Sequence, residues 1–228
     1  MSKDPAAGAM LIAGALLGVV VMALHPTGHS LAEDFQRQAA LGAIVHGVAI
    51  AGIPVTFLGL LGLWRRLGGT RLATSGLVAY AWAGVAVLSA AVMSGFVSTT
   101  MIGRSMRAED ESAKTLYHAL ADLSFQMNQG YAKVFFVASC VALLLFSAAI
   151  LATRRLAPAA GTAGVVIATL LLVLFGVGHL TMDVHGFGAM TVAQSLWLVA
   201  VGALLCRDAP PGAPPGSPQG RPDPATRP

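Results

Sequence analysis

Three histidines occupy matching depths in separate apolar segments of the chain. His25 lies near the end of the first segment, within MALHPTGHSLAED, His46 follows the start of the second, and His179 ends the fifth. Counted at about 1.5 Å per residue from the opposite end of its segment, each imidazole lies about 28 Å along its helix. Neutral imidazoles bind zinc and copper. We therefore predict that His25, His46 and His179 meet at one level and contact a metal ion or cofactor directly.

Further ionisable side chains are expected around this site. His118 and Asp122 are one helical turn apart, so the carboxylate can orient the ring, as carboxylates do beside metal-bound histidines. The stretch HLTMD repeats this spacing between His179 and Asp183. The residues predicted to form the rim of the site or to support its ligands are His29, His118, Asp122, Asp183 and His185.

The segment TLYHALADLSFQMNQGYAK predicts a helix with one polar face. Polar side chains recur along it at steps of four, four, three and four, namely His118, Asp122, Gln126, Gln129 and Lys133. This spacing places them on one helical face. Apolar side chains lie off that face, namely Leu116, Leu120, Leu123 and Met127. We predict that Gln126, Gln129 and Lys133 line a water-filled cavity.

The residues leave several functions open. Three imidazoles suit zinc or copper. Methionines are concentrated toward the same end of the segments, where thioethers would favour copper, but methionine is also ordinary packing material in apolar helices, and for the methionines alone packing is the preferred interpretation. Two histidines on facing helices could instead ligate one haem b. Alternatives without a cofactor are a proton-coupled permease or carrier, and a non-catalytic membrane assembly or envelope protein with interfacial histidines. No nucleophile signature, phosphate-binding loop or dinucleotide fingerprint is present, so no catalytic residue is predicted.

The segments that carry these residues are long enough to cross a membrane. Of 228 residues, 56% are hydrophobic and 11% are charged, whereas soluble domains carry about 25% charged residues. A spanning helix needs about 20 apolar residues. Six such segments occur, at about 6–24, 40–64, 73–100, 131–153, 160–180 and 188–206, and residues 115–130 extend the fourth. We predict an all-α bundle of six transmembrane helices over residues 1–206.

The positions of basic residues predict how the chain is oriented in the membrane. Arginine pairs occur in the second–third connection (Arg65, Arg66) and the fourth–fifth connection (Arg154, Arg155), on the side of both termini. Basic loops stay in the cytoplasm, which places the termini there and the histidines on the outer side. The basic residues that flank the segments account for the net charge of +4, so nucleic acid is not an expected partner. The expected partner is the lipid bilayer, and whether the protein forms a homo-oligomer is left open. Residues 207–228, rich in Pro and Gly, predict a disordered cytoplasmic tail.

Small residues predict where helices approach closely. Gly14 and Gly18 lie in GALLG of the first segment, and Gly59 and Gly62 lie in GLLG of the second. In lipid, packing drives helix association, and small residues let backbones come together. We interpret these glycines as helix–helix contacts rather than as parts of a cofactor site.

Four short stretches resemble a group of small, uncharacterised bacterial integral membrane proteins. They are ALHP, GLLGLWRRL, MNQGYAKV and DVHGFGAM. The resemblance implies a multi-span helical protein of the bacterial inner membrane and carries over no catalytic residue. A fainter similarity exists to six-helix cytochrome b561-type haem proteins, which use histidine pairs near both membrane faces. This chain has no histidine in its inner half, so the similarity implies at most one haem, near the outer face.

Overall fold

The computed structural model describes residues 4–25 and 35–207, and for residues 35–39 it describes the backbone alone. The predictions for His29 and for a disordered tail after Arg207 lie outside these residues. Within them every regular element is a helix, and none is a strand.

Six helical segments are long and apolar enough to cross a bilayer, which confirms the predicted fold class. The helices are α1 (Pro5–Ala23), α2 (Phe35–Arg66), α3 (Arg71–Val92), α4 (Thr99–Arg107), α5 (Glu111–Thr153), α6 (Pro158–Gly176) and α7 (Val184–Cys206), and a π-helix, η1 (Met93–Ser98), joins α3 to α4. The third crossing therefore comprises α3, η1 and α4 together. The chain is a multi-pass membrane protein, and lipid is its surrounding medium.

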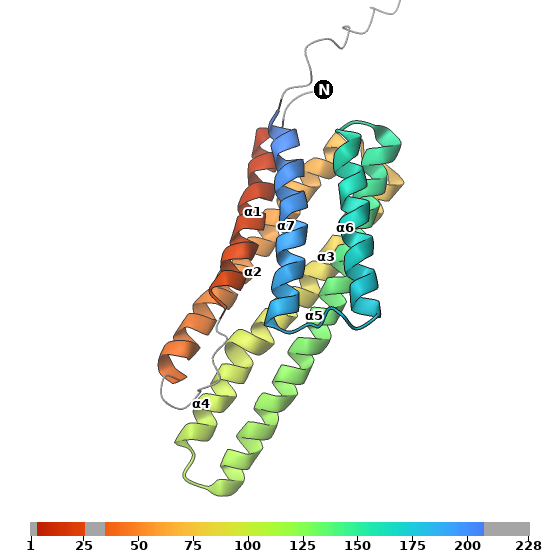
Figure 1. Cartoon of the computed structure of the whole chain (residues 1–228). Coiled ribbons are helices and arrows are strands. Elements are labelled where there is room, and N and C mark those ends of the chain that lie inside the picture. Colours follow the sequence, from red (N-terminus) through yellow and green to blue (C-terminus); the bar gives the residue numbers. More distant parts are fainter. Residues whose placement is uncertain (1–3, 26–34, 208–228) are drawn as a thin grey trace, which may run out of the picture.

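The two described ends of the chain lie together at one end of the bundle (Figure 1). The Asp4 backbone N–H donates to the Leu205 carbonyl over 3.3 Å, joining the start of α1 to the end of α7. The Asp4 carboxylate caps α1 by accepting from the Ala7 N–H at 3.0 Å. The connections that carry Arg66 and Arg154 lie at this same end, so the arginine pairs and the termini share one side of the membrane.

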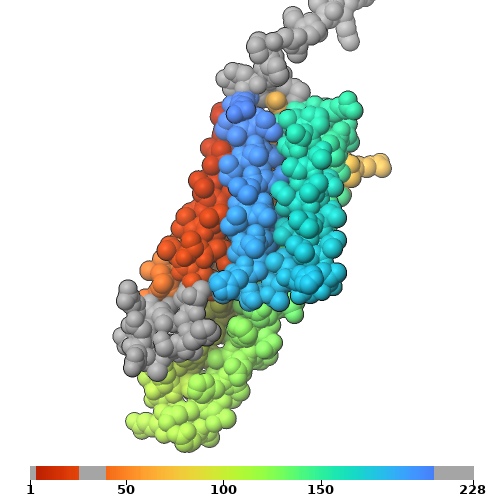
Figure 2. Space-filling view, in the orientation of Figure 1, coloured from red at the N-terminus to blue at the C-terminus, as the bar shows by residue number. Residues whose placement is uncertain are grey.

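The opposite end is extended by a helical hairpin of α4 and the first half of α5 (Figures 1 and 2). With 43 residues, α5 is about 65 Å long, twice the hydrocarbon thickness of about 30 Å. A span of about 20 residues counted back from Thr153 reaches Lys133. The structure thus confirms the predicted helical extension over residues 115–130. Asp110 begins it by accepting from the backbone N–H of Ala113 at 3.3 Å.

Glycines hold α1 against both of its neighbours. A Cβ added to Gly62 would lie 2.1 Å from the Ala7 Cβ, and one added to Gly59 would lie 2.8 Å from the backbone N of Leu11. Gly59 and Gly62, predicted to lie at helix–helix contacts, are thus where α2 meets α1. A second contact joins α1 to α7, where a Cβ on Gly8 would lie 2.5 Å from the Gly202 carbonyl oxygen. As a result α1 lies between α2 and α7, while α6 packs on α5 and α7.

Candidate metal site at the outer end of the bundle

His25 and His46 come together at the end of the bundle remote from the termini. Their ring centroids are 5.3 Å apart, and the ring planes are inclined at 68°. His25 follows the last turn of α1, and His46 lies three turns into α2, so the close packing of these helices brings the rings together. Both side chains are half-buried.

A hydrogen bond defines the tautomer of neutral His46. Its Nδ1 lies 2.7 Å from the Gly42 carbonyl oxygen, one turn earlier in α2. Because a carbonyl only accepts, Nδ1 must carry the proton, and the lone pair of the neutral ring is on Nε2. Metal-binding histidines typically donate their second nitrogen in this way, which aligns the ring and raises its basicity. His46 therefore has the backbone support of a ligand.

The π-helix η1 packs directly against His46. A Cβ added to Gly95 would lie 2.5 Å from the Cβ of His46 and 2.7 Å from its Cγ. The buried Ser124 hydroxyl of α5 donates to the Met93 carbonyl of η1 at 2.9 Å, which ties this segment to the hairpin. Single π turns inside helices recur at functional sites. Here the π turn presents a glycine to the imidazole and so keeps it in place.

Both histidines line one cavity of about 170 Å³. The other residues that line the cavity include Met22, Met182, Asn128, Gln129 and Asp183. Met22 lies in the last turn of α1, three residues before His25. Two histidines and two methionines from three parts of the chain thus line one cavity.

The two rings meet edge to face. A centroid separation of 5.3 Å at 68° is an ordinary T-shaped ring contact, and it is also short enough for both rings to reach one ion with metal–nitrogen bonds of about 2.0 Å. The cavity of about 170 Å³ is smaller than the roughly 300–1,000 Å³ of cofactor pockets.

His179 does not join this pair. It is exposed in the connection after α6, and its backbone N–H donates to the Leu174 carbonyl at 2.9 Å. Among residues 4–25 and 35–207, no group of three or more His, Cys, Asp or Glu side chains is placed to hold a metal. The predicted three-histidine cluster is therefore corrected to a pair, His25 and His46, because α6 packs on the far side of α7 from α1.

The predicted rim residues separate into different places. Asp183 lines the cavity, whereas His185 is exposed on the first turn of α7. His118 and Asp122 are exposed on the hairpin, where they line another open cavity, of about 380 Å³. Of the predicted cavity-lining side chains, Gln129 lies beside the histidines, while Gln126 and Lys133 are exposed on α5.

Two features of the site were not predicted from the sequence. Asn128 lines the cavity next to Gln129; its polar side chain beside the predicted polar face was the available signal. Gly95 carries no comparable signal, since its role depends on η1 lying against α2.

Asp183 caps α7 at the edge of the cavity. One carboxylate oxygen accepts from the Gly186 N–H at 2.8 Å, and the other accepts from the Thr181 hydroxyl at 2.8 Å. The hydrogen bond from Gly186, followed by that from Thr181 and the nearby His185, lowers the pKa of this carboxyl below its ordinary value. The ionised form is the better cap, so it stabilises the start of α7 at neutral pH.

This cap predicts a pH-dependent contribution to stability. Since the pKa of Asp183 is lower in the folded state, its stabilisation is present above the unfolded pKa and is lost as pH falls through the folded pKa. Asp183→Asn can still accept from the Gly186 N–H through its amide oxygen, but its NH2 group cannot accept from Thr181 and it cannot ionise. The wild type should unfold at a higher temperature than this variant at pH 7, and the gap should narrow as the pH falls below 3.8, the ordinary pKa of aspartate, as measured by circular dichroism in detergent. A gap that is constant with pH would contradict this role for the charge.

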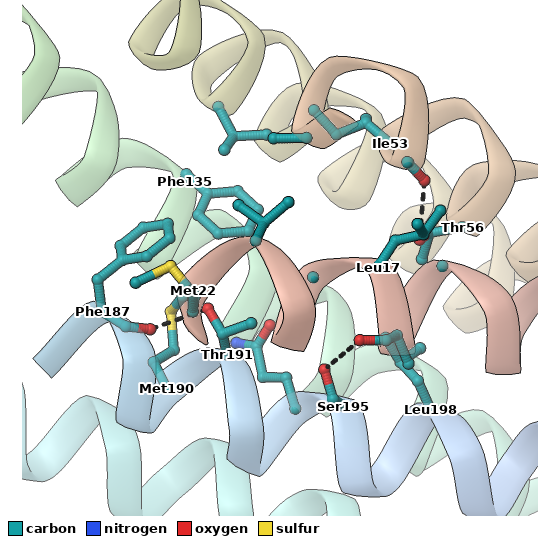
Figure 3. Close-up of a pocket in the computed structure, with 18 of the residues that line it drawn as sticks. Leu17, Met22, Ile53, Thr56, Phe135, Phe187, Met190, Thr191, Ser195 and Leu198 are labelled. Atoms are coloured by element: carbon teal, nitrogen blue, oxygen red, sulfur yellow. Dashed lines mark hydrogen bonds between the residues drawn. The ribbon is translucent and has the colours of Figure 1, made fainter. Parts of the chain in front are cut away.

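Figure 3 shows the side chains that line a second cavity, which lies between α1, α2 and α7. It has a volume of about 120 Å³ and shares Met22 and Phe187 with the outer cavity. Its polar side chains already bond to the protein: Thr56 donates to the Gly52 carbonyl at 3.2 Å, and Ser195 donates to the Ala15 carbonyl at 3.2 Å. Met22 and Met190 also line this inner cavity, whereas His25 and His46 line only the outer one.

No protein-family model, curated protein or solved structure matches this chain.

Proposed function

We propose that this protein binds a transition-metal ion, copper(I) in particular, at the outer face of a bacterial inner membrane. The observation that carries the proposal is the 5.3 Å pairing of His25 with His46 in a cavity that two methionines also line. The bond from His46 Nδ1 to the Gly42 carbonyl supports it, because it leaves Nε2 for the metal.

The ligand chemistry favours copper(I) over zinc. Thioether sulfur is a soft ligand that selects copper(I), and imidazole suits both metals. Zinc sites recruit carboxylates and thiolates, but the Asp183 carboxylate is engaged by Gly186 and Thr181, and Cys140 does not line the cavity. Met22 and Met182 would therefore complete the coordination of copper(I).

A site of two imidazoles and two thioethers suits metal handling rather than catalysis. Four protein ligands complete a tetrahedral sphere and leave no position open for a water or a substrate. The arginine pairs lie at the end of the bundle that carries both chain termini, which favours a cytoplasmic location for that end. The site, at the opposite end, would then face the extracytoplasmic side. The proposed role is thus to hold or pass on copper at that face.

The test is copper(I) binding by the purified full-length protein. In detergent and under reducing conditions, titration against a coloured copper(I) chelator should show one ion per chain. His25→Ala and His46→Ala should each weaken binding at least 100-fold, because each removes a ligand. His179→Ala is the matched control, an outer histidine outside the cavity, and should bind as the wild type does. Equal binding by all three variants would refute the proposal.

Methionine variants distinguish the metals. Met22→Leu and Met182→Leu conserve volume and should weaken copper(I) binding while leaving zinc binding unchanged. If zinc binds tightly and both leucine variants bind copper(I) as the wild type does, the site is a two-imidazole site for another metal.

A carrier is the second candidate, and the adjoining cavities favour it. The outer and inner cavities share Met22 and Phe187, so together they extend from the outer edge toward the middle of the bundle. A carrier would move copper into proteoliposomes that contain the protein, whereas a binding protein would saturate at one ion per chain.

A further inference from the structure

One face of α5 exposes apolar side chains along much of its length. From Leu116 to Val141 they recur at alternating steps of four and three, at Leu116, Leu120, Leu123, Met127, Gly130, Val134, Val137 and Val141. All eight positions are exposed. Alternation of three and four is the heptad spacing of a helix that packs along a partner helix with a left-handed supercoil. We call this face the α5 seam.

The outer half of the seam lies beyond the bilayer. Because the span counted from Thr153 ends near Lys133, the hairpin residues before Lys133 are in water. There Leu116 is 58% exposed and Leu123 is 56% exposed. Lipid accounts for exposed valines within the membrane, but it does not account for a row of leucines outside it.

The seam is separate from the other two faces of this segment. The first packs against the rest of the hairpin, where Ala121 and Ser124 are buried. The second is the polar face, where His118, Asp122 and Gln126 are exposed. A hairpin surrounded only by water would be polar on both exposed sides. The seam therefore has the composition of a surface that is covered.

Gly130 indicates that another helix covers the α5 seam. This glycine lies within the continuous helix α5, where glycine costs about 1 kcal/mol relative to alanine. A Cβ added there would meet nothing within 4 Å, so no contact within the chain requires a glycine. It lies in the seam near the membrane edge, where a small residue lets two helix backbones approach closely.

We infer that the α5 seam is the interface of a parallel homodimer, in which α5 packs along α5 of a second copy. Copies inserted in the same orientation align their α5 helices in parallel, and a heptad seam is then self-complementary, each position meeting its own counterpart. The seam spans 26 residues, within the roughly three to four heptads that specify a coiled coil. It contains no charged residue, so pairing places no like charges in contact.

The test is disulfide cross-linking of the full-length protein in membranes. In a background of Cys140→Ser and Cys206→Ser, Leu123→Cys places a thiol in the seam, and Gln126→Cys places a thiol at the same depth on the polar face as the matched control. After oxidation with diamide, Leu123→Cys should give at least tenfold more species of twice the chain mass than Gln126→Cys. Equal yields from Leu123→Cys and Gln126→Cys, or no dimer from Leu123→Cys, would overturn the inference.

A bulky residue at Gly130 provides a second test. Gly130→Leu has room in the monomer, so the thermal unfolding of its helices should match that of the parent. It should nonetheless reduce cross-linking through Leu123→Cys at least tenfold, because the helices can no longer approach. Unchanged cross-linking would exclude helix contact at Gly130, and attachment to a chain of different mass would show that another protein covers the seam.

Discussion

Alanine at Gly95 is expected to weaken metal binding and to destabilise the outer end of the bundle. The added methyl group would lie 2.5 Å from His46 Cβ and 2.7 Å from its Cγ. These atoms are near the backbone, so a rotamer change cannot remove the overlap, and η1 must move away from α2. Overpacking of this kind costs about 1–3 kcal/mol. Copper(I) affinity should fall at least tenfold in the chelator titration, with a lower unfolding temperature.

Gly47→Ala is the matched control for this effect. Gly47 follows His46 in the same helix, and a Cβ there would meet nothing within 4 Å. Alanine in place of a helical glycine normally stabilises by about 0.5–1 kcal/mol, so this variant should keep its copper(I) affinity. If Gly95→Ala and Gly47→Ala had the same copper(I) affinity, the contact between η1 and His46 would not support the site.

Alanine at Gly8 is expected to separate α1 from α7. Its Cβ would lie 2.5 Å from the Gly202 carbonyl oxygen, which is backbone and cannot turn aside. The expected cost is about 1–3 kcal/mol of unfolding free energy, measured by unfolding the detergent-solubilised protein with increasing denaturing detergent. Metal binding at the other end of the helix pair should be affected less than stability.

Gly18→Ala tests whether the effect belongs to that contact. Gly18 also lies on α1 and faces α7, but a Cβ there would lie 3.4 Å from the Thr191 Cγ2, an ordinary contact. This variant should be as stable as the wild type or slightly more stable. If Gly8→Ala were equally stable, close contact between the backbones of α1 and α7 would not be needed.

The comparison of His25, His46 and His179 shows where prediction from sequence succeeded and where it failed. Depth in the membrane follows from counting residues, because each helical residue advances by about 1.5 Å. That count placed all three histidines near one end of the bundle. It carried no information on which helices are neighbours, and the packing of α1 on α2 united two rings while α6 lay elsewhere.

The glycines also show that sequence patterns do not identify which helices are neighbours. The short spacing in GALLG and GLLG predicted helix–helix contacts at these glycines, but it did not identify the partner helices, which are α2 and α7 for GALLG and α1 for GLLG. The contact of Gly8 with Gly202 joins residues at opposite ends of the chain, and neither one has a local pattern that identifies its partner. Likewise, the heptad spacing of α5 is visible in the sequence, but only the structure shows that this face is exposed.

The sequence by itself determined the all-α class, the six spans, the extended fourth helix and the depth of each ionisable group, because hydrophobicity and helical rise are local properties that add along a chain. Tertiary structure alone decided that His25 pairs with His46, that Gly95 of a π-helix supports the ring, and that methionines line the same cavity. These depend on the rotation and neighbours of each helix, which arise from contacts between residues far apart in sequence.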